Sequence, residues 1–261
     1  MIAQKQSNPR ICFLILSSVY EPWKSLYEAG PRQTWVKDWK HNPQTFFFTY
    51  SGIPRKFTEL AKLHNFILRR QTFLKFWTSK KDLPDASFNG PDKILVNIDE
   101  RWDTMTLKFL SAAKLILDTF EFDFLVKTNT TTYVNQSALM SAINCKPDYM
   151  GVPSKNGRFA VGWGQIYSRT AIYKATELYR SANIGNVFFE DEAIGALMSE
   201  LGYGLVPTSS NIIKNLEEVE SGKNNSDKVF TRLYYKLGKK RNDDILFASF
   251  HKHFKSQSTK Y

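Results

Sequence analysis

The sequence predicts an α/β fold in which helices flank a mostly parallel central sheet, and two observations support this prediction. Short apolar runs of strand length recur along the chain, each rich in β-forming residues and bounded by turn residues. Segments with apolar residues three and four positions apart lie between these runs, as amphipathic helices require. Strands that alternate with helices pair in parallel, because each helix returns the chain to the start of the next strand.

The elements follow in chain order. The predicted strands span residues 11–16, 45–49, 93–98 and 122–127. The predicted helices span residues 102–117, 137–143, 170–181 and 193–201. In open α/β sheets, ligands bind beyond the carboxyl ends of the strands, so the segments after residues 98 and 127 are the first candidates for a site. No internal repeat, dinucleotide-binding glycine pattern or P-loop is present in the sequence.

Composition and charge narrow the classes of protein. The 261 residues are 42% hydrophobic and 23% charged, which is typical of a globular chain. The 36 Lys and Arg exceed the 25 Asp and Glu by 11 charges, which favours an anionic partner such as a phosphate. Residues 223–261 hold ten of these cations and only three Asp, so they form a basic module. Two cysteines, Cys12 and Cys145, are too few for a disulfide framework and fit a reducing compartment.

Membrane signals are weak. The apolar segment at residues 11–19 is about half of a membrane span, and no cleavage site follows it. We therefore expect a cytoplasmic protein without signal peptide or transmembrane segment. Residues 56–81 interleave basic and apolar side chains, which leaves two interpretations open. The segment is either a surface helix packed on the core or an interfacial helix that contacts an anionic membrane peripherally.

Six short segments carry a recognisable pattern. They are PRQTW at 31–35, ERWDTMTLK at 100–108, FLVKTNTTTYVN at 124–135, GWGQIYS at 162–168, EDEAIG at 190–195 with a following Leu201-Gly202, and SFHKH at 249–253. In this order and spacing they resemble glycosyltransferase family 31, the β-1,3-galactosyl-, β-1,3-N-acetylglucosaminyl- and fringe-type transferases. The resemblance spans residues 31–254, which makes it far more specific than any single block.

The resemblance implies a GT-A fold with a Rossmann-like nucleotide-binding half, formed by one domain over residues 1–261. The basic segment at 223–261 would then pack on the donor site. It also implies an inverting transfer of a hexosyl or pentosyl group from a nucleotide-diphosphate sugar, with UDP as the expected nucleotide, to a glycan hydroxyl. The expected partners are this donor and a glycan acceptor of bacterial or viral type. Nucleic acid is not an expected partner, because no nucleic-acid-binding module is recognisable.

An inverting displacement needs a carboxylate that takes the proton of the acceptor hydroxyl. The position of the family's base matches Asp191, so we expect Asp191 to be the catalytic residue. Glu190 precedes it and Glu192 replaces the family's usual Val, and both are expected near the acceptor or the sugar. The alternative is that Asp191 only caps the helix at 193–201.

The family's Asp-Asp-Asp motif is replaced by Asn129, Thr130 and Thr131. One neutral amide and two hydroxyls are weak ligands for Mg²⁺ or Mn²⁺, so the metal-binding motif is absent as written. We therefore expect a metal-independent transferase that requires no cofactor. Two alternatives stay open behind it: a transferase that holds Mn²⁺ or Mg²⁺ through other ligands, and a fold that binds glycan or nucleotide without catalysis.

Without a metal, cations and hydrogen-bond donors must stabilise the leaving diphosphate. His251 matches the family's metal-ligating histidine and would be free to donate to phosphate, or to hold a metal if one is used. The other residues expected at the donor are Arg32, Trp35, Lys127, Asn129, Thr130, Thr131, Arg158 and Lys252.

Four further residues have open roles. Lys108 either reaches the donor or pairs with a carboxylate. Gly162 and Gly164 fit a loop that passes close to a bound sugar, where Gly164 would contact it. Trp163 between them is either a stacking platform for the sugar or a core residue.

Overall fold

The structure is a computed structural model that describes residues 9–18, 21–39, 44–50, 82–98, 104–181, 189–221, 227–237 and 240–258. The predicted amphipathic segment at 56–81 lies outside the described residues, as do Glu100 and Trp102. Within the described part of the chain, no helix is long and apolar enough to cross a membrane.

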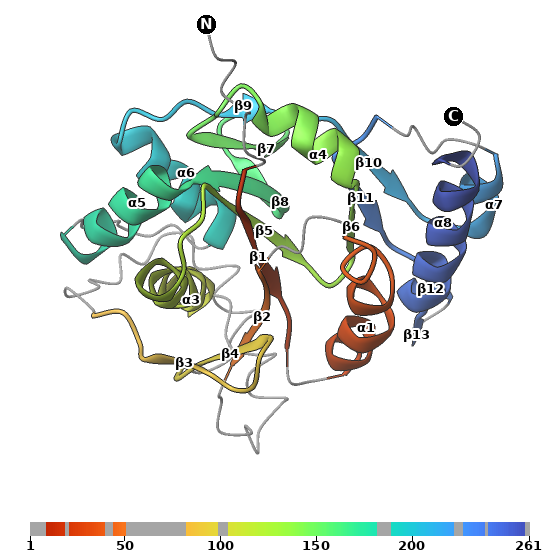
Figure 1. The fold of residues 1–261 in the computed structure, drawn as a ribbon, viewed down its shortest axis with the longest axis horizontal. Coiled ribbons are helices and arrows are strands. Elements are labelled where there is room, and N and C mark those ends of the chain that lie inside the picture. Colours follow the sequence, from red (N-terminus) through yellow and green to blue (C-terminus); the bar gives the residue numbers. More distant parts are fainter. Residues whose placement is uncertain are drawn as a thin grey trace, which may run out of the picture.

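An eight-stranded sheet forms the centre of the molecule (Figure 1). Its strands lie in the order β3-β4-β2-β1-β5-β8-β7-β9. Neighbouring strands of the β4-β2-β1-β5 group pair in parallel, whereas β8 is antiparallel to both β5 and β7. The prediction of an α/β fold with a mostly parallel central sheet is confirmed. The strand bounds are β1 (Ile11–Leu16), β2 (Gln44–Tyr50), β3 (Ala86–Phe88), β4 (Lys93–Val96), β5 (Phe124–Asn129), β7 (Tyr149–Pro153), β8 (Ala160–Ser168) and β9 (Val206–Pro207).

Helices cover both faces of this sheet (Figure 1). One face is covered by α3 (Met105–Thr119), α5 (Arg169–Ser181) and α6 (Glu190–Glu200). The other is covered by α1 (Trp23–Ala29), the short η1 (Pro31–Gln33), α4 (Gln136–Ile143), α7 (Leu216–Glu220) and α8 (Asp243–Ser258). The predicted helices agree with α3, α4, α5 and α6 apart from one to three residues at their ends, with Trp102 outside the described residues.

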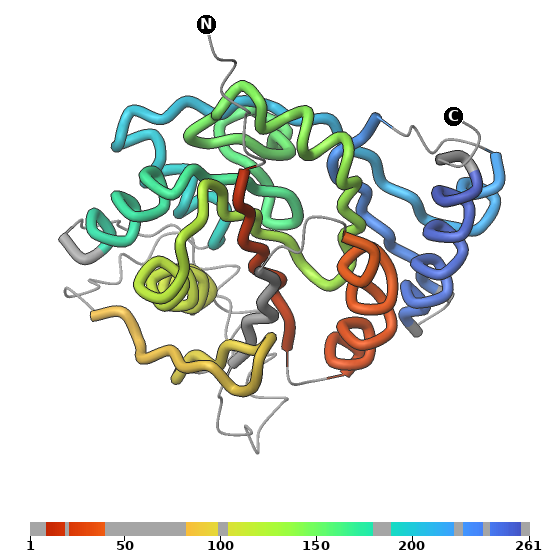
Figure 2. The backbone as a smooth tube through the Cα atoms, viewed as in Figure 1, coloured from red at the N-terminus to blue at the C-terminus, as the bar shows by residue number. Residues whose placement is uncertain are grey.

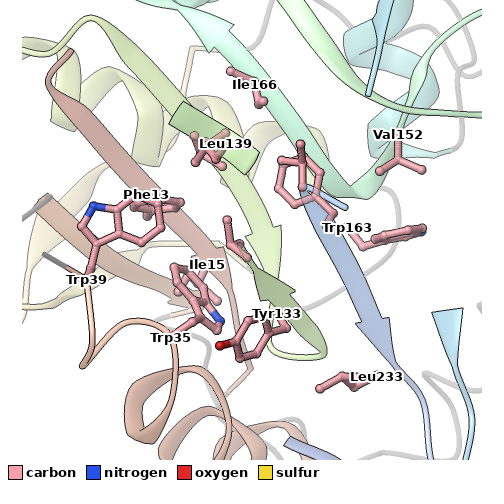
Figure 3. Close-up of a cluster of buried hydrophobic side chains, with 14 of the residues drawn as sticks. Phe13, Ile15, Trp35, Trp39, Tyr133, Leu139, Val152, Trp163, Ile166 and Leu233 are labelled. Atoms are coloured by element: carbon pink, nitrogen blue, oxygen red, sulfur yellow. The ribbon is translucent and has the colours of Figure 1, made fainter. Parts of the chain in front are cut away.

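The alternation of side chains along β1 separates two hydrophobic cores. Cys12 and Leu14 point toward the core under α3, α5 and α6. Phe13 and Ile15 point toward the other core, where Phe13 packs edge-on against Trp35 and Trp39 (Figure 3). Because successive residues of a strand face opposite sides of a sheet, an all-apolar run such as β1 is buried on both faces.

A second sheet of three strands, in the order β10-β11-β6, lies beside the first. Its strands are β10 (Ser210–Ile213), β11 (Phe230–Leu233) and β6 (Thr132–Val134), and β6 follows β5 after a two-residue turn. A small hairpin of β12 (Lys236–Leu237) and β13 (Lys240–Arg241) leads from β11 into α8. The basic segment predicted at 223–261 thus contributes a strand, a hairpin and a helix.

Helix α8 ties the end of the chain to its beginning. It contacts α1, α7 and β11, and Figure 2 shows it in blue beside α1 in orange. Its buried side chains Leu246, Phe247 and Phe250 belong to the same core as Phe13 and Trp35. The end of the described chain is therefore an integral part of the fold.

Candidate functional site

The carboxyl edge of the parallel strands brings together segments from distant parts of the chain. The turn at residues 129–131 follows β5 at this edge. On the antiparallel β8, Gln165 is opposite Lys127, so Gly162 comes to lie near the end of β5. The N–H of Gly162 donates to Asp191 Oδ2 over 3.2 Å, which joins the start of α6 to the same place.

Lys127 and Glu190 form a buried ion pair at this edge. The Lys127 Nζ lies 2.5 Å from Glu190 Oε2 and donates to the Gly162 carbonyl over 2.9 Å. The side chains are only 1% and 8% exposed. Burial raises the pKa of Glu190, and the charge of Lys127 acts against this rise. The ammonium of Lys127, expected at the donor, is thus committed to two protein partners.

Asp191 is half-buried in the first turn of α6. Besides the bond from Gly162, its Oδ1 accepts the N–H of Glu192 over 3.1 Å. The helix begins at Glu190, with Phe189 at the N-cap, three residues earlier than predicted. Asp191 therefore does not occupy the N-cap position of the alternative interpretation, and its carboxylate links α6 to β8 instead. Glu192 is exposed to solvent.

Asn129 closes the turn between β5 and β6. Its Oδ1 accepts from the Thr131 N–H at 3.0 Å, the Thr131 hydroxyl at 2.8 Å and the Thr132 hydroxyl at 3.0 Å. Thr130 and Thr131 are each only 2% exposed. An Asn side chain that bonds to the backbone two residues ahead is a common way to hold such a turn. Within the described residues, no group of three or more His, Cys, Asp or Glu is placed to hold a metal ion.

Gly162 and Gly164 lie inside β8 and not in the expected loop. A Cβ on Gly164 would approach atoms of Phe230 and Val152 to 2.8 Å, so the absence of a side chain lets these residues pack on the strand. Trp163 between the glycines is 8% exposed and belongs to the hydrophobic core (Figure 3). Of its two open roles, the structure favours the core residue.

Both ring nitrogens of His251 have protein partners. Nδ1 lies 2.9 Å from the Tyr133 hydroxyl, and Nε2 lies 3.0 Å from Asp38 Oδ2, which also pairs with Lys255. Burial lowers the pKa of His251, while Asp38 acts to raise it. The sequence suggests a histidine free to donate to phosphate, but these contacts engage it between α8, β6 and the segment after η1. Lys252 is exposed on α8.

The remaining expected residues have different surroundings. Trp35 is buried and donates from Nε1 to the Thr132 carbonyl over 3.0 Å, which supports the chain just after the 129–131 turn. Arg32 pairs instead with Glu28 at 2.9 Å and Asp92 at 3.5 Å. Arg158 is exposed in the turn that precedes β8.

Lys108 is fully buried and donates to the Ser17 carbonyl, just beyond the end of β1, over 2.9 Å. Its charge acts to lower the pKa of Glu190. Lys108 therefore binds the backbone after β1, at the carboxyl edge of the sheet, from inside the core.

Sequence reasoning missed Arg232. This residue lies on β11 directly opposite Thr132 of β6, next to the turn that Asn129 closes. A single Arg in a four-residue strand carries no motif, and only the pairing of β11 with β6 reveals its neighbours. In the comparisons with known proteins, no family model matches the chain and no curated protein matches its sequence.

Proposed function

We propose that the chain is an inverting glycosyltransferase that moves a sugar from a nucleotide diphosphate, with UDP as the expected nucleotide, to a glycan hydroxyl. The observation that carries the proposal is the carboxylate of Asp191. It is half-buried at the carboxyl edge of the sheet, and the Gly162 N–H fixes one of its oxygens. Ligands of open α/β sheets bind at this edge.

In the proposed reaction, Asp191 accepts the proton of the acceptor hydroxyl as that oxygen attacks the anomeric carbon. The bond from the anomeric carbon to the diphosphate breaks on the opposite face of the sugar, which inverts the configuration. A general base has to lie within hydrogen-bonding reach of the hydroxyl proton that it takes. Asp191 is only half-buried, so an acceptor hydroxyl can approach its carboxylate.

The ion pair of Lys127 and Glu190 supports this geometry. Lys127 binds both the Gly162 carbonyl and the Glu190 carboxylate, and these residues are respectively bonded and adjacent to Asp191. A base held on both sides keeps its orientation when substrate binds, which is a large part of catalytic efficiency. We therefore assign Lys127 and Glu190 to positioning.

The proposal is tested with purified protein and a panel of nucleotide-diphosphate sugars, by measuring nucleotide release in EDTA and in Mn²⁺. We expect turnover in EDTA and its loss, by at least a hundredfold, in Asp191→Asn with donor affinity retained. Glu200→Gln, an exposed carboxylate at the other end of α6, is the matched control and should behave as wild type. Full activity of Asp191→Asn would remove the assigned base, and an absolute requirement for Mn²⁺ would exclude metal independence.

One observation favours a second function, that of a fold that binds nucleotide or glycan without catalysis. The residues at the family's metal-binding positions have structural contacts here: Thr131 is buried in the turn, and His251 bonds to Tyr133 and Asp38. Calorimetric binding of UDP or a glycan, combined with no turnover of any donor and acceptor pair, would favour this second function.

A further inference from the structure

Arg232 lies beside the turn that replaces the acidic motif. On the antiparallel pair of β11 and β6 it is directly opposite Thr132, and the next N–H, that of Leu233, donates to the Thr131 carbonyl over 2.8 Å. Directly opposed residues of an antiparallel pair point to the same face. The side chain of Arg232 therefore starts beside Thr132, whose hydroxyl is 3.0 Å from Asn129 Oδ1.

Within the described part of the chain, Arg232 has no hydrogen-bonded anion. Its Nε is buried without a hydrogen-bond partner. Asp243 forms its ion pair with Arg241, and only the more distant charge of Asp243 acts on Arg232. Burial and the neighbouring charge of Arg241 lower the pKa of Arg232. A buried donor on a charged group is costly when it is unpaired. Arg232 as a whole is only half-buried, so an anion from outside the chain can reach its guanidinium and supply the missing counter-charge.

Neighbouring aromatic and charged side chains surround the guanidinium of Arg232. The guanidinium groups of Arg232 and Arg241 lie 5.9 and 4.3 Å from the centre of the Tyr234 ring. Arg241 is fixed by the fully buried Asp243 and also lies 5.1 Å from the ring of Trp23, at the start of α1. Asp243 bonds directly to Arg241 and acts on Arg232 only through its charge, so Arg232 is the member of this pair without a bonded carboxylate among the described residues.

We propose that Arg232 binds the diphosphate of the nucleotide donor and that Tyr234, Arg241 and Asp243 form its rigid support. The identity of the ligand rests on the proposed glycosyltransferase function. A guanidinium presents two parallel N–H donors to phosphate oxygens, and it stabilises the negative charge that develops as the nucleotide leaves. His251, the residue expected to donate to phosphate, is instead engaged by Tyr133 and Asp38.

The test is calorimetric titration of the full chain with UDP and with inorganic pyrophosphate, both in EDTA. We expect Arg232→Gln to weaken both ligands at least tenfold and Arg232→Lys, which keeps the charge but loses the fork, to weaken them less. The control is Arg10→Gln, an arginine that precedes β1 at the opposite edge of the sheet, with a side chain 58% exposed, and it should bind as wild type. Melting curves establish that each variant is folded. If Arg232→Gln does not fold, the affinity of Arg232→Lys for the two ligands tests the role of Arg232 instead.

The outcomes separate the two proposals. Wild-type affinity of the folded Arg232 variants for both ligands would overturn the role of Arg232, and so would undiminished sugar transfer by Arg232→Gln, although the glycosyltransferase function would then stand. Pyrophosphate binding that is lost in Arg232→Gln, without turnover of any nucleotide sugar, would support the anion site and contradict the glycosyltransferase. Failure of the wild type to bind either ligand would overturn the anion site.

Discussion

At the scale of single residues, the ion pair of Lys127 and Glu190 has to be kept intact because neither charge can reach water. The side chains are 1% and 8% exposed, and the second oxygen of Glu190, Oε1, is buried without a hydrogen-bond partner. The free-energy cost of taking both charges out of water offsets much of their attraction, so the pair adds little net stability while it fixes the surrounding backbone. Removal of only one member would leave the other charge buried without its partner.

We expect Lys127→Met to lower the free energy of unfolding by about 3–5 kcal/mol, since it leaves Glu190 buried without its hydrogen-bonded counter-charge. Lys127→Met combined with Glu190→Leu should recover most of this loss, because two apolar side chains of similar size replace the pair. Urea unfolding followed by circular dichroism measures both. Equal stabilities of the single and double variants would contradict a coupled pair.

His251 gives a prediction for pH. Burial holds its pKa below the usual 6.5, so the unfolded chain takes up a proton at a higher pH than the folded chain does. Between these two pKa values the unfolded state binds more protons at His251, so the contribution of His251 to the free energy of unfolding falls as the pH drops below about 6.5. The variant His251→Gln should lose this part of the pH dependence when urea unfolding is compared between pH 7.5 and 5.5. An identical pH slope in both proteins would mean that His251 does not contribute.

At the scale of elements, the glycines of β8 control how the two sheets meet. A Cβ on Gly164 would lie 2.8 Å from Phe230, which comes from β11 of the second sheet. We expect Gly164→Ala to destabilise the protein by about 1–3 kcal/mol, as overpacking does in a well-filled core. Gly204→Ala is the matched control, since a Cβ there meets nothing within 4 Å. Thermal unfolding of both variants measures the difference, and equal melting temperatures would contradict this packing role.

The same elements show how far the sequence predicts the fold. Long apolar runs such as β1 and long amphipathic segments such as α3 are recognisable alone, because their pattern records their burial. β6, of three residues, and β11, of four, were not predicted, since so short a strand depends on its partners for stability. The glycines at 162 and 164 predict a loop when the sequence is taken alone, but they lie in a strand. Their lack of a side chain makes room for Lys127 and Phe230, and this packing cannot be predicted from the sequence.

The sequence also predicts only part of the candidate site. The motif resemblance points to Asp191, Glu190 and the 129–131 turn, and the structure brings these segments to one edge of the sheet. Sequence could not predict that Lys127 turns inward to Glu190, or that His251 bonds to Tyr133, 118 positions away. Arg232 became a candidate only through the register of β11 against β6. Contacts between distant segments decide which cations remain available for a ligand.

At the scale of the whole molecule, the position of each cation matters more for anion binding than the net charge of +11. Much of the excess lies on exposed side chains such as Lys252 and Lys255, where solvent screens it. In the proposed anion site, the charge that would bind the ligand is the half-buried guanidinium of Arg232 beside the 129–131 turn, which Arg241 of the hairpin before α8 supports.

A ligand at this edge should therefore stabilise the fold as a unit. A ligand that binds only the folded state, at 100 times its Kd, adds about 2.7 kcal/mol to the free energy of unfolding. We expect UDP to raise the melting temperature in EDTA, because a guanidinium and not a metal ion would meet the diphosphate, and uridine alone to raise it much less. Differential scanning fluorimetry with UDP, pyrophosphate and uridine, with and without Mn²⁺, measures these shifts. A shift that appears only with Mn²⁺ would assign the diphosphate to a metal and contradict a cationic site, since added metal should change little where the positive charge is already part of the chain.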